Sequence, residues 1–119
     1  MADMICRADE RSIQIRNQVR GGNGDAIFAH IFKSGEGLNE NMRLFSVITL
    51  KEGDSIGYHV HEGEDELYLI LSGEAAYDDN GVKTTLKAGD GTLTASGEGH
   101  SIMCTGKEDL QLLAVIVKN

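Results

Sequence analysis

The sequence predicts an all-β fold, an antiparallel jelly roll closed into a small barrel, and two observations carry that prediction. Short runs rich in β-branched and aromatic residues recur along the chain, separated by glycine-rich turns. The chain of 119 residues contains 15 glycines and no proline, so its turns depend on glycine and asparagine. About ten such strands without a convincing helix suit two packed antiparallel sheets.

The length allows one domain with one core. We expect residues 1–24 to form an N-terminal arm and residues 25–119 to form a single barrel domain. Outside the central stretch described below, strands are expected at 26–32, 43–50, 74–78, 82–86 and 110–117. The pair at 74–78 and 82–86 is a hairpin, because Asn80-Gly81 supplies the positive φ of a tight turn. The last segment is almost entirely apolar, which predicts burial by the core on one face and by a second subunit on the other.

Composition excludes several classes of partner. Lys and Arg total 11 against 19 Asp and Glu, and the net charge of −8 argues against nucleic acid. No apolar run reaches the roughly 18 residues of a membrane span. The first residues lack a secretory signal pattern, and Cys6 and Cys104 lack metal-type or redox-type spacing. We therefore expect a cytoplasmic protein with reduced thiols.

The chemistry concentrates in residues 53–73. His59 and His61 lie two positions apart on an expected strand, so both side chains project from one face and can grip one ion. Glu66 opens the next strand after a polar turn and can return a carboxylate to the two imidazoles. The full spacing is Gly, five residues, His-x-His, four residues, Glu, six residues, Gly.

This spacing resembles the first motif of the cupin superfamily at every fixed position. Residues 89–104 resemble the second motif, with His100 in place, although Ala95 stands where the family usually has proline and Cys104 where it usually has asparagine. The resemblance implies a double-stranded β-helix, a homodimer formed through the sheets, and a metal site. That site would consist of His59, His61, Glu66 and His100.

Three imidazoles and one carboxylate suit Mn, Fe, Co, Ni or Zn. With a divalent ion the site would carry a charge near +1 and leave about two coordination positions open. It should therefore attract a small anionic or oxygen-chelating ligand. Strand alternation places Tyr68, Ile70, Ile102 and Cys104 in the interior, so the pocket is expected to be mostly apolar.

Several residues are candidates for catalysis or substrate binding, and most of them also have a purely structural interpretation. Tyr68 and Glu98 are candidate catalytic groups, but Glu98, like Glu62 and Glu64, also reads as a solvated loop carboxylate. Arg43, Tyr68, Ile102 and Cys104 are candidate substrate-binding residues. Arg43 either reaches the barrel mouth to pair with an anionic substrate or sits at a solvated strand end. Cys104 is a thiol beside the metal or a small core hydrophobe. His30 reads as a satisfied or interface histidine.

The stretch 20–117 resembles small bacterial cupins often labelled oxalate-decarboxylase-like. Oxalate decarboxylases have an arginine three residues before the first motif histidine, and this chain has Ile56 there. Two functions follow from the resemblance. One is a metalloenzyme acting on a small carboxylate or oxygenated metabolite, as a decarboxylase, dioxygenase, lyase or isomerase. The other is a non-catalytic, metal-dependent module that binds a small molecule.

Overall fold

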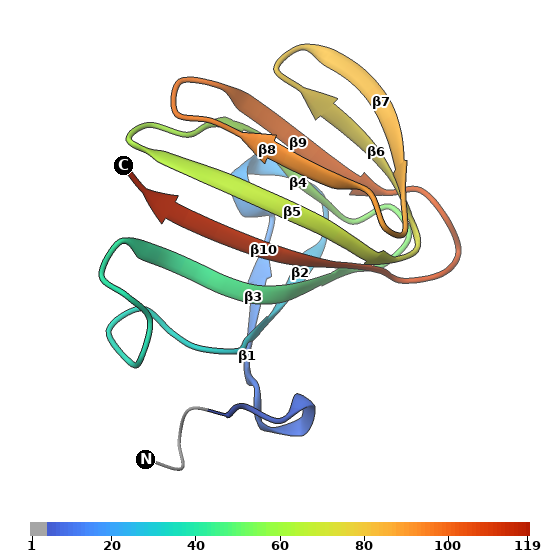
Figure 1. Ribbon diagram of the computed structural model, residues 1–119. Coiled ribbons are helices and arrows are strands. Elements are labelled where there is room, and N and C mark those ends of the chain that lie inside the picture. Colours follow the sequence, from blue (N-terminus) through green and yellow to red (C-terminus); the bar gives the residue numbers. More distant parts are fainter. Residues whose placement is uncertain (1–4) are drawn as a thin grey trace.

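Two antiparallel sheets face each other across a common core in the computed structural model, which describes residues 5–119 (Figure 1). The six-stranded sheet has the order β1-β2-β3-β10-β5-β8, and the four-stranded sheet has the order β4-β9-β6-β7. The strands are β1 (Ser12–Asn17), β2 (Asp25–His30), β3 (Met42–Leu50), β4 (Ser55–Val60), β5 (Glu64–Ser72), β6 (Glu74–Asp79), β7 (Val82–Lys87), β8 (Gly91–Thr94), β9 (Gly99–Cys104) and β10 (Leu110–Lys118). The expected all-β jelly roll is confirmed.

The expected hairpin is present between β6 and β7, with Asp79 paired to Val82 across the turn. Asn80 and Gly81 have φ values of 51° and 95°, the left-handed conformation that this turn needs. Asn80 fits because its short polar side chain tolerates that region better than most residues.

The core follows from strand alternation. On β5, Glu66, Tyr68 and Ile70 are buried, while the intervening side chains face outward. On β9, Ile102 and Cys104 are each 1% exposed, as their interior assignment predicted. The buried set that joins the two sheets includes Phe28, Ile48, Leu50, Ile56, Tyr68, Ile70, Tyr77, Ile102, Leu110 and Leu112.

The closing strand β10 lies in the middle of the six-stranded sheet and pairs with both β3 and β5. One face of β10 is buried in the core, and its other face carries the half-buried Leu113 and Val115. On the neighbouring strands, Leu67, Leu69 and Leu93 are 41%, 41% and 58% exposed. The outer face of this sheet is therefore apolar and only partly covered within one chain.

The N-terminal segment reaches the barrel through two short 3-10 turns, η2 (Ala8–Glu10) and η3 (Val19–Gly21), and through β1. β1 pairs with β2 at the sheet edge, and all six of its residues are exposed.

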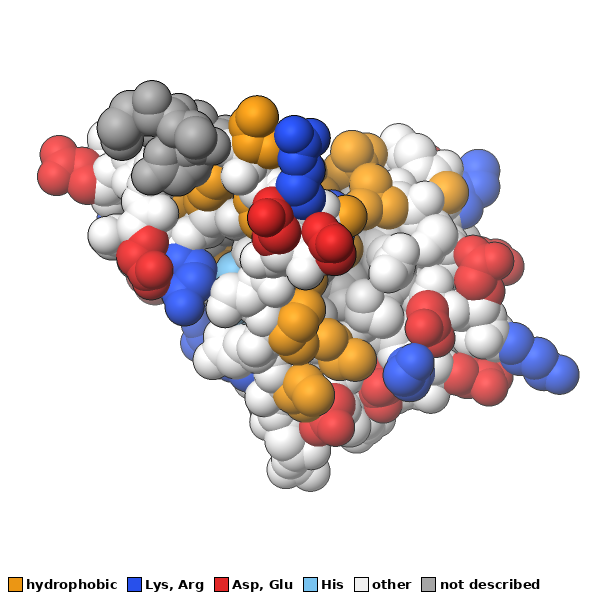
Figure 2. Space-filling view, turned by 90° about the horizontal axis from the view of Figure 1, so that it is seen from below, with side chains coloured by type: hydrophobic (Ala, Val, Ile, Leu, Met, Phe, Trp, Pro, Cys, Tyr) orange, Lys and Arg blue, Asp and Glu red, His pale blue; other side chains and the backbone are white. Residues whose placement is uncertain are grey.

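In Figure 2, hydrophobic side chains on the face seen from below gather into bands between charged ones. The division into an arm (1–24) and a domain (25–119) stays a prediction, and residues 1–4 of that arm lie outside the described range.

No helix within the described part of the chain combines the length and apolar character needed to traverse a lipid bilayer.

Candidate metal centre

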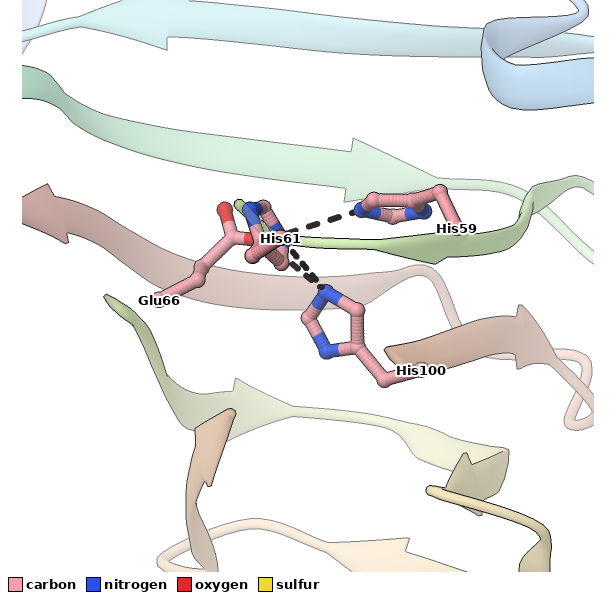
Figure 3. Close-up of side chains that lie close together, drawn as sticks. All are labelled: His59, His61, Glu66 and His100. Atoms are coloured by element: carbon pink, nitrogen blue, oxygen red, sulfur yellow. Dashed lines mark hydrogen bonds and ion pairs between the residues drawn. The ribbon is translucent and has the colours of Figure 1, made fainter. Parts of the chain in front are cut away.

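Four side chains from three different segments converge between the sheets (Figure 3). His59 comes from β4, His61 lies just after it, Glu66 comes from β5 and His100 from β9. The β4–β9 register places His59 directly opposite His100. One ligand atom from each residue lies within 4.8 Å of the others, so the group could hold a metal ion. His61, Glu66 and His100 are buried, at 2%, 4% and 0% exposed.

The distances between these ligand atoms match the distances expected between adjacent ligands of one metal ion. Glu66 Oε1 lies 3.0 Å from His61 Nε2 and 3.0 Å from His100 Nε2, and the two Nε2 atoms are 3.1 Å apart. His59 Nε2 is farther, 4.0 Å from the same oxygen. Ligand atoms bound at about 2.1 Å to a common metal at right angles are about 3 Å apart. The spacing of three of the four atoms is thus that of adjacent metal ligands.

In His59 and His61, the hydrogen bond made by Nδ1 determines that Nε2 is the unprotonated nitrogen. His59 Nδ1 donates to the carbonyl oxygen of Gly57 at 2.7 Å, and His61 Nδ1 donates to the Glu64 carboxylate at 3.0 Å. Neither acceptor carries a proton, so both Nδ1 atoms hold theirs. In the neutral rings Nε2 is therefore a lone-pair donor, as a metal ligand requires.

His100 Nδ1 lies 2.9 Å from Tyr77 Oη and 3.0 Å from Thr94 Oγ1, two hydroxyl groups that can each donate to it or accept from it. All three rings thus present Nε2 to one point, where the Glu66 carboxylate also points. Lone pairs and an anionic oxygen at such distances repel each other unless a proton or a metal cation lies among them. The donor set therefore fits a transition metal ion.

Glu64 links this centre to an arginine. Arg43 Nε and Nη2 donate to the two Glu64 oxygens at 2.8 Å each. The Arg43 guanidinium, together with the His61 hydrogen bond, lowers the pKa of Glu64 to about 2, against the opposing effect of burial. Glu64 is therefore ionised at neutral pH, and the bond that it accepts from His61 is charge-assisted.

The ring charges differ between the ligands. Burial lowers the pKa of His59 to about 4, so this ring is neutral at pH 7. The hydrogen bond to Glu66 raises the pKa of His61, although burial opposes it. Burial tends to raise the pKa of Glu66, but the bonds from His100 and His61 outweigh it and lower the pKa. Because a metal ligand must be neutral, the raised pKa of His61 opposes metal binding as the pH falls.

A cavity of about 130 Å³ opens beside His59, His61 and Glu66. Its apolar walls include Phe28, Leu44, Ile48, Ile56 and Ile116, but polar groups make up about as much of the lining, so the expectation of a mostly apolar pocket is wrong. Three arginines, Arg16, Arg20 and Arg43, also line it. The volume suits a small ligand, and the charges suit an anion.

Two of the candidate residues lie at this cavity. Tyr68 is 4% exposed, and its ring stacks on His100 with 5.0 Å between ring centroids. Burial raises the pKa of Tyr68 well above 10, so the phenol keeps its proton. Arg43 lines the cavity while bound to Glu64, so it reaches the mouth and is already paired.

Three other candidates lie elsewhere in the described residues. Ile102 and Cys104 pack in the core away from the cavity lining, and Cys104 Sγ contacts the carbonyl oxygen of Glu108 at 3.4 Å. Glu98 accepts a hydrogen bond from the Ala95 backbone N–H at 3.1 Å within its own turn. That turn also bonds the backbone of His61, which keeps His100 in place without proline at position 95.

Sequence reasoning missed Arg16 and Arg20 at the cavity, and it did not separate Glu64 from Glu62. His30, read as satisfied, bonds Gln14 Oε1 at 2.9 Å. The glycine at position 57, within an expected strand, was a sign that another backbone packs closely there. A Cβ on Gly57 would lie 2.2 Å from the Arg20 carbonyl oxygen, so only glycine lets the Arg20 loop touch β4.

A jelly-roll barrel that gathers three histidines and a glutamate beside an open cavity defines a class of small β-barrel proteins whose side chains could hold a metal ion. Comparison with known proteins agrees: the family model described as "Cupin domain" matches residues 46–116. The chain belongs to the cupin family, as its two motifs predicted.

Relatives match nearly the whole chain. An oxalate-binding protein of Thermotoga maritima is 45% identical over 114 residues, which cover 96% of this chain and 93% of that protein. A crystal structure from T. maritima, described as a predicted oxalate decarboxylase, has 44% identity and a TM-score of 0.92, with 98% and 100% of the two chains covered. A Klebsiella pneumoniae protein with a double-stranded β-helix domain has 29% identity and a TM-score of 0.72, with 98% and 90% covered.

Proposed function

We propose that this cupin binds one divalent transition metal through His59, His61, Glu66 and His100 and uses it to bind a small carboxylate. The observation that carries the proposal is the convergence of three imidazole Nε2 atoms and one carboxylate oxygen beside a cavity lined by arginines. The name of the 45% identical relative makes oxalate the first ligand to test.

The donor set suits Mn, Fe, Co, Ni or Zn. Such an ion would supply a positive charge and open coordination positions for a carboxylate oxygen. The protein would supply the surroundings: Phe28 and Ile48 exclude water from the cavity, and Glu64 fixes the His61 ring. Tyr68, protonated and stacked on His100, is the candidate proton donor to a bound ligand.

Two functions share this complex. The placement of Glu98 favours the binding module. Its carboxylate accepts a hydrogen bond within its own turn and does not line the cavity, so of the two candidate catalytic residues only Tyr68 lies in the described lining. The metalloenzyme that the sequence favoured, a decarboxylase, dioxygenase, lyase or isomerase, is supported by the fully buried His100 and by the protonated Tyr68 beside it. We propose binding as the common step and turnover as the second candidate.

Elemental analysis of the purified protein tests the metal centre. We expect about one equivalent of metal, lost in the His59→Ala/His61→Ala double variant and kept in His30→Ala, whose histidine lies outside the centre. Calorimetry should then show oxalate binding that depends on the metal. Metal retained by the double variant would overturn the proposed ligand set.

Product analysis separates the two functions. Metal-loaded protein incubated with oxalate yields carbon dioxide and formate if the centre decarboxylates it, and these products should vanish in Tyr68→Phe if the phenol donates the proton. Oxalate bound and recovered unchanged, with no oxygen consumed, identifies the binding module for this ligand.

A homodimer is part of the proposal. The outer face of β8, β5 and β10 exposes Leu67, Leu69 and Leu93 around the half-buried Leu113 and Val115, and a second copy of the same face is a matching apolar surface. Light scattering should give twice the chain mass, and Leu69→Glu should give monomers. We place the protein in the cytoplasm, which cell fractionation checks.

A further inference from the structure

The charges at the cavity have the opposite sign to the protein. The chain carries a net charge of −8, yet the charged groups of the described lining, histidines aside, are Arg16, Arg20, Arg43 and the single carboxylate Glu66. Glu66 belongs to the proposed metal centre. The remaining charges are all positive and come from the N-terminal segment and β3, so an anion entering the cavity meets a cationic wall.

Only two of these arginines are available to a ligand. Arg43 is held by both oxygens of Glu64. Arg16 lies with its guanidinium carbon 5.2 Å from the centre of the Phe28 ring, a contact that leaves its N–H groups free. Within residues 5–119, neither Arg16 nor Arg20 forms an ion pair with a carboxylate.

The backbone holds Arg20 in an unusual conformation. Gln18 and Arg20 have φ values of 50° and 55°, a left-handed region that costs an ordinary side chain about 1 kcal/mol or more. Between them, Val19 is buried against the core. Such conformations persist where the surroundings impose them, and they concentrate at functional sites.

Two glycines allow the loop around Arg20 to pack closely against β4. A Cβ on Gly22 would lie 2.2 Å from the Ser55 carbonyl oxygen, and a Cβ on Gly57 would lie 2.2 Å from the Arg20 carbonyl oxygen. The loop and β4 therefore touch backbone to backbone. Because Gly57 is two residues before His59 on β4, Arg20 is fixed to the strand that carries a proposed metal ligand.

We propose that Arg20, together with Arg16 from the lining of the same cavity, forms a subsite for a second anionic group of the ligand, so that the ligand class is a small dicarboxylate. A guanidinium binds a carboxylate through two parallel N–H bonds. Ile56, which lines the same cavity, offers no charge, so the cation comes from the N-terminal segment instead of β4. This inference rests on the proposed carboxylate function of the metal centre.

Calorimetry on protein loaded with Mn²⁺ or Zn²⁺, whichever gives the higher occupancy, tests the subsite with three probes: oxalate and malonate as dicarboxylates and acetate as the monocarboxylate. The variant is Arg20→Asn, because asparagine tolerates a left-handed φ. Arg20→Lys keeps the charge without the planar fork. Lys107→Asn, at an exposed turn away from the cavity, is the control for loss of one charge.

We expect Arg20→Asn to weaken dicarboxylate binding about 10- to 100-fold, the range for lost hydrogen bonds to charged groups. Acetate affinity and metal content should stay within twofold of wild type, as should every property of Lys107→Asn. Arg20→Lys should fall between wild type and Arg20→Asn. Urea unfolding of each variant checks that the fold is intact.

The outcomes separate this inference from the function beneath it. Unchanged dicarboxylate affinity in Arg20→Asn, or an equal loss for acetate, overturns the subsite while carboxylate binding at the metal stands. Wild-type protein that holds metal and binds none of the three probes overturns the carboxylate function and the subsite with it. If Arg20→Asn does not fold, Arg16→Gln provides the same comparison, with the same losses expected.

Discussion

Replacing Glu64 by glutamine should weaken metal binding about tenfold, because this carboxylate fixes the ring of His61. In the wild type Glu64 accepts the His61 Nδ1 proton at 3.0 Å and two Arg43 bonds at 2.8 Å. Glutamine has the same shape but no charge and only one acceptor oxygen. That oxygen either accepts a weaker, neutral bond from His61 or bonds to Arg43 and leaves His61 without a partner. A charge-assisted bond is about 1–2 kcal/mol stronger than a neutral one, a factor of roughly 5 to 30 in affinity. Loss of a bond partner behind a metal ligand costs a similar factor, about 10 to 100.

The assay is a competition titration of metal between the protein and a chromogenic chelator at fixed pH. Glu62→Gln is the matched control, because Glu62 belongs to the same turn and is exposed. It should bind metal as wild type does. Equal metal affinity in Glu64→Gln and Glu62→Gln would refute the reasoning and reduce the Arg43–Glu64 pair to a surface contact.

Three further effects concern stability. Gly57→Ala should cost at least about 2 kcal/mol, because its Cβ meets the Arg20 backbone at 2.2 Å, and urea titration should show it. Ile102→Ala should cost about 2–5 kcal/mol in the same assay, with metal content unchanged, since this side chain is 1% exposed and packs in the core. The pKa of Glu64 falls from 4.5 to about 2 on folding, mainly through Arg43, so its stabilisation is complete above pH 4.5 and disappears as pH falls toward 2. At most about 3 kcal/mol of the free energy of unfolding is lost in that window. Urea unfolding of the metal-free proteins at pH 5 and pH 3 should therefore show a smaller loss of stability for Glu64→Gln than for the wild type. A Glu64→Gln variant with the wild-type acid profile would contradict it.

Local periodicity predicted most of the strands, although β1 was assigned to an arm, and it grouped three of the four candidate metal ligands; His100 came from the resemblance of the second motif. Two-residue alternation places His59 with His61, and Glu66 with Tyr68 and Ile70, on shared faces, because strand geometry fixes those relations without tertiary information. The same rule identified Ile102 and Cys104 as interior. It could not decide which interior positions border the cavity, since that depends on where the two sheets separate.

Contacts between distant segments explain what the sequence could not supply. Glu62 and Glu64 look equivalent in a polar turn, but β5 already begins at Glu64, and this brings its carboxylate to Arg43. Arg20 reaches the cavity only because its loop packs on β4 across 37 positions of sequence, at Gly57. Nothing in the local pattern around Arg20 encodes that contact.

The central position of β10 has a consequence for how the protein is made. This strand joins β3 to β5, yet it follows the other nine strands in the chain, so during translation the six-stranded sheet lacks its middle until β10 leaves the ribosome. Pairings of such long sequence separation form slowly. All four proposed metal ligands are synthesised before β10, so a newly made chain can meet metal ions while its barrel is still open. Ion capture by the proposed ligands can therefore precede the closure of the barrel.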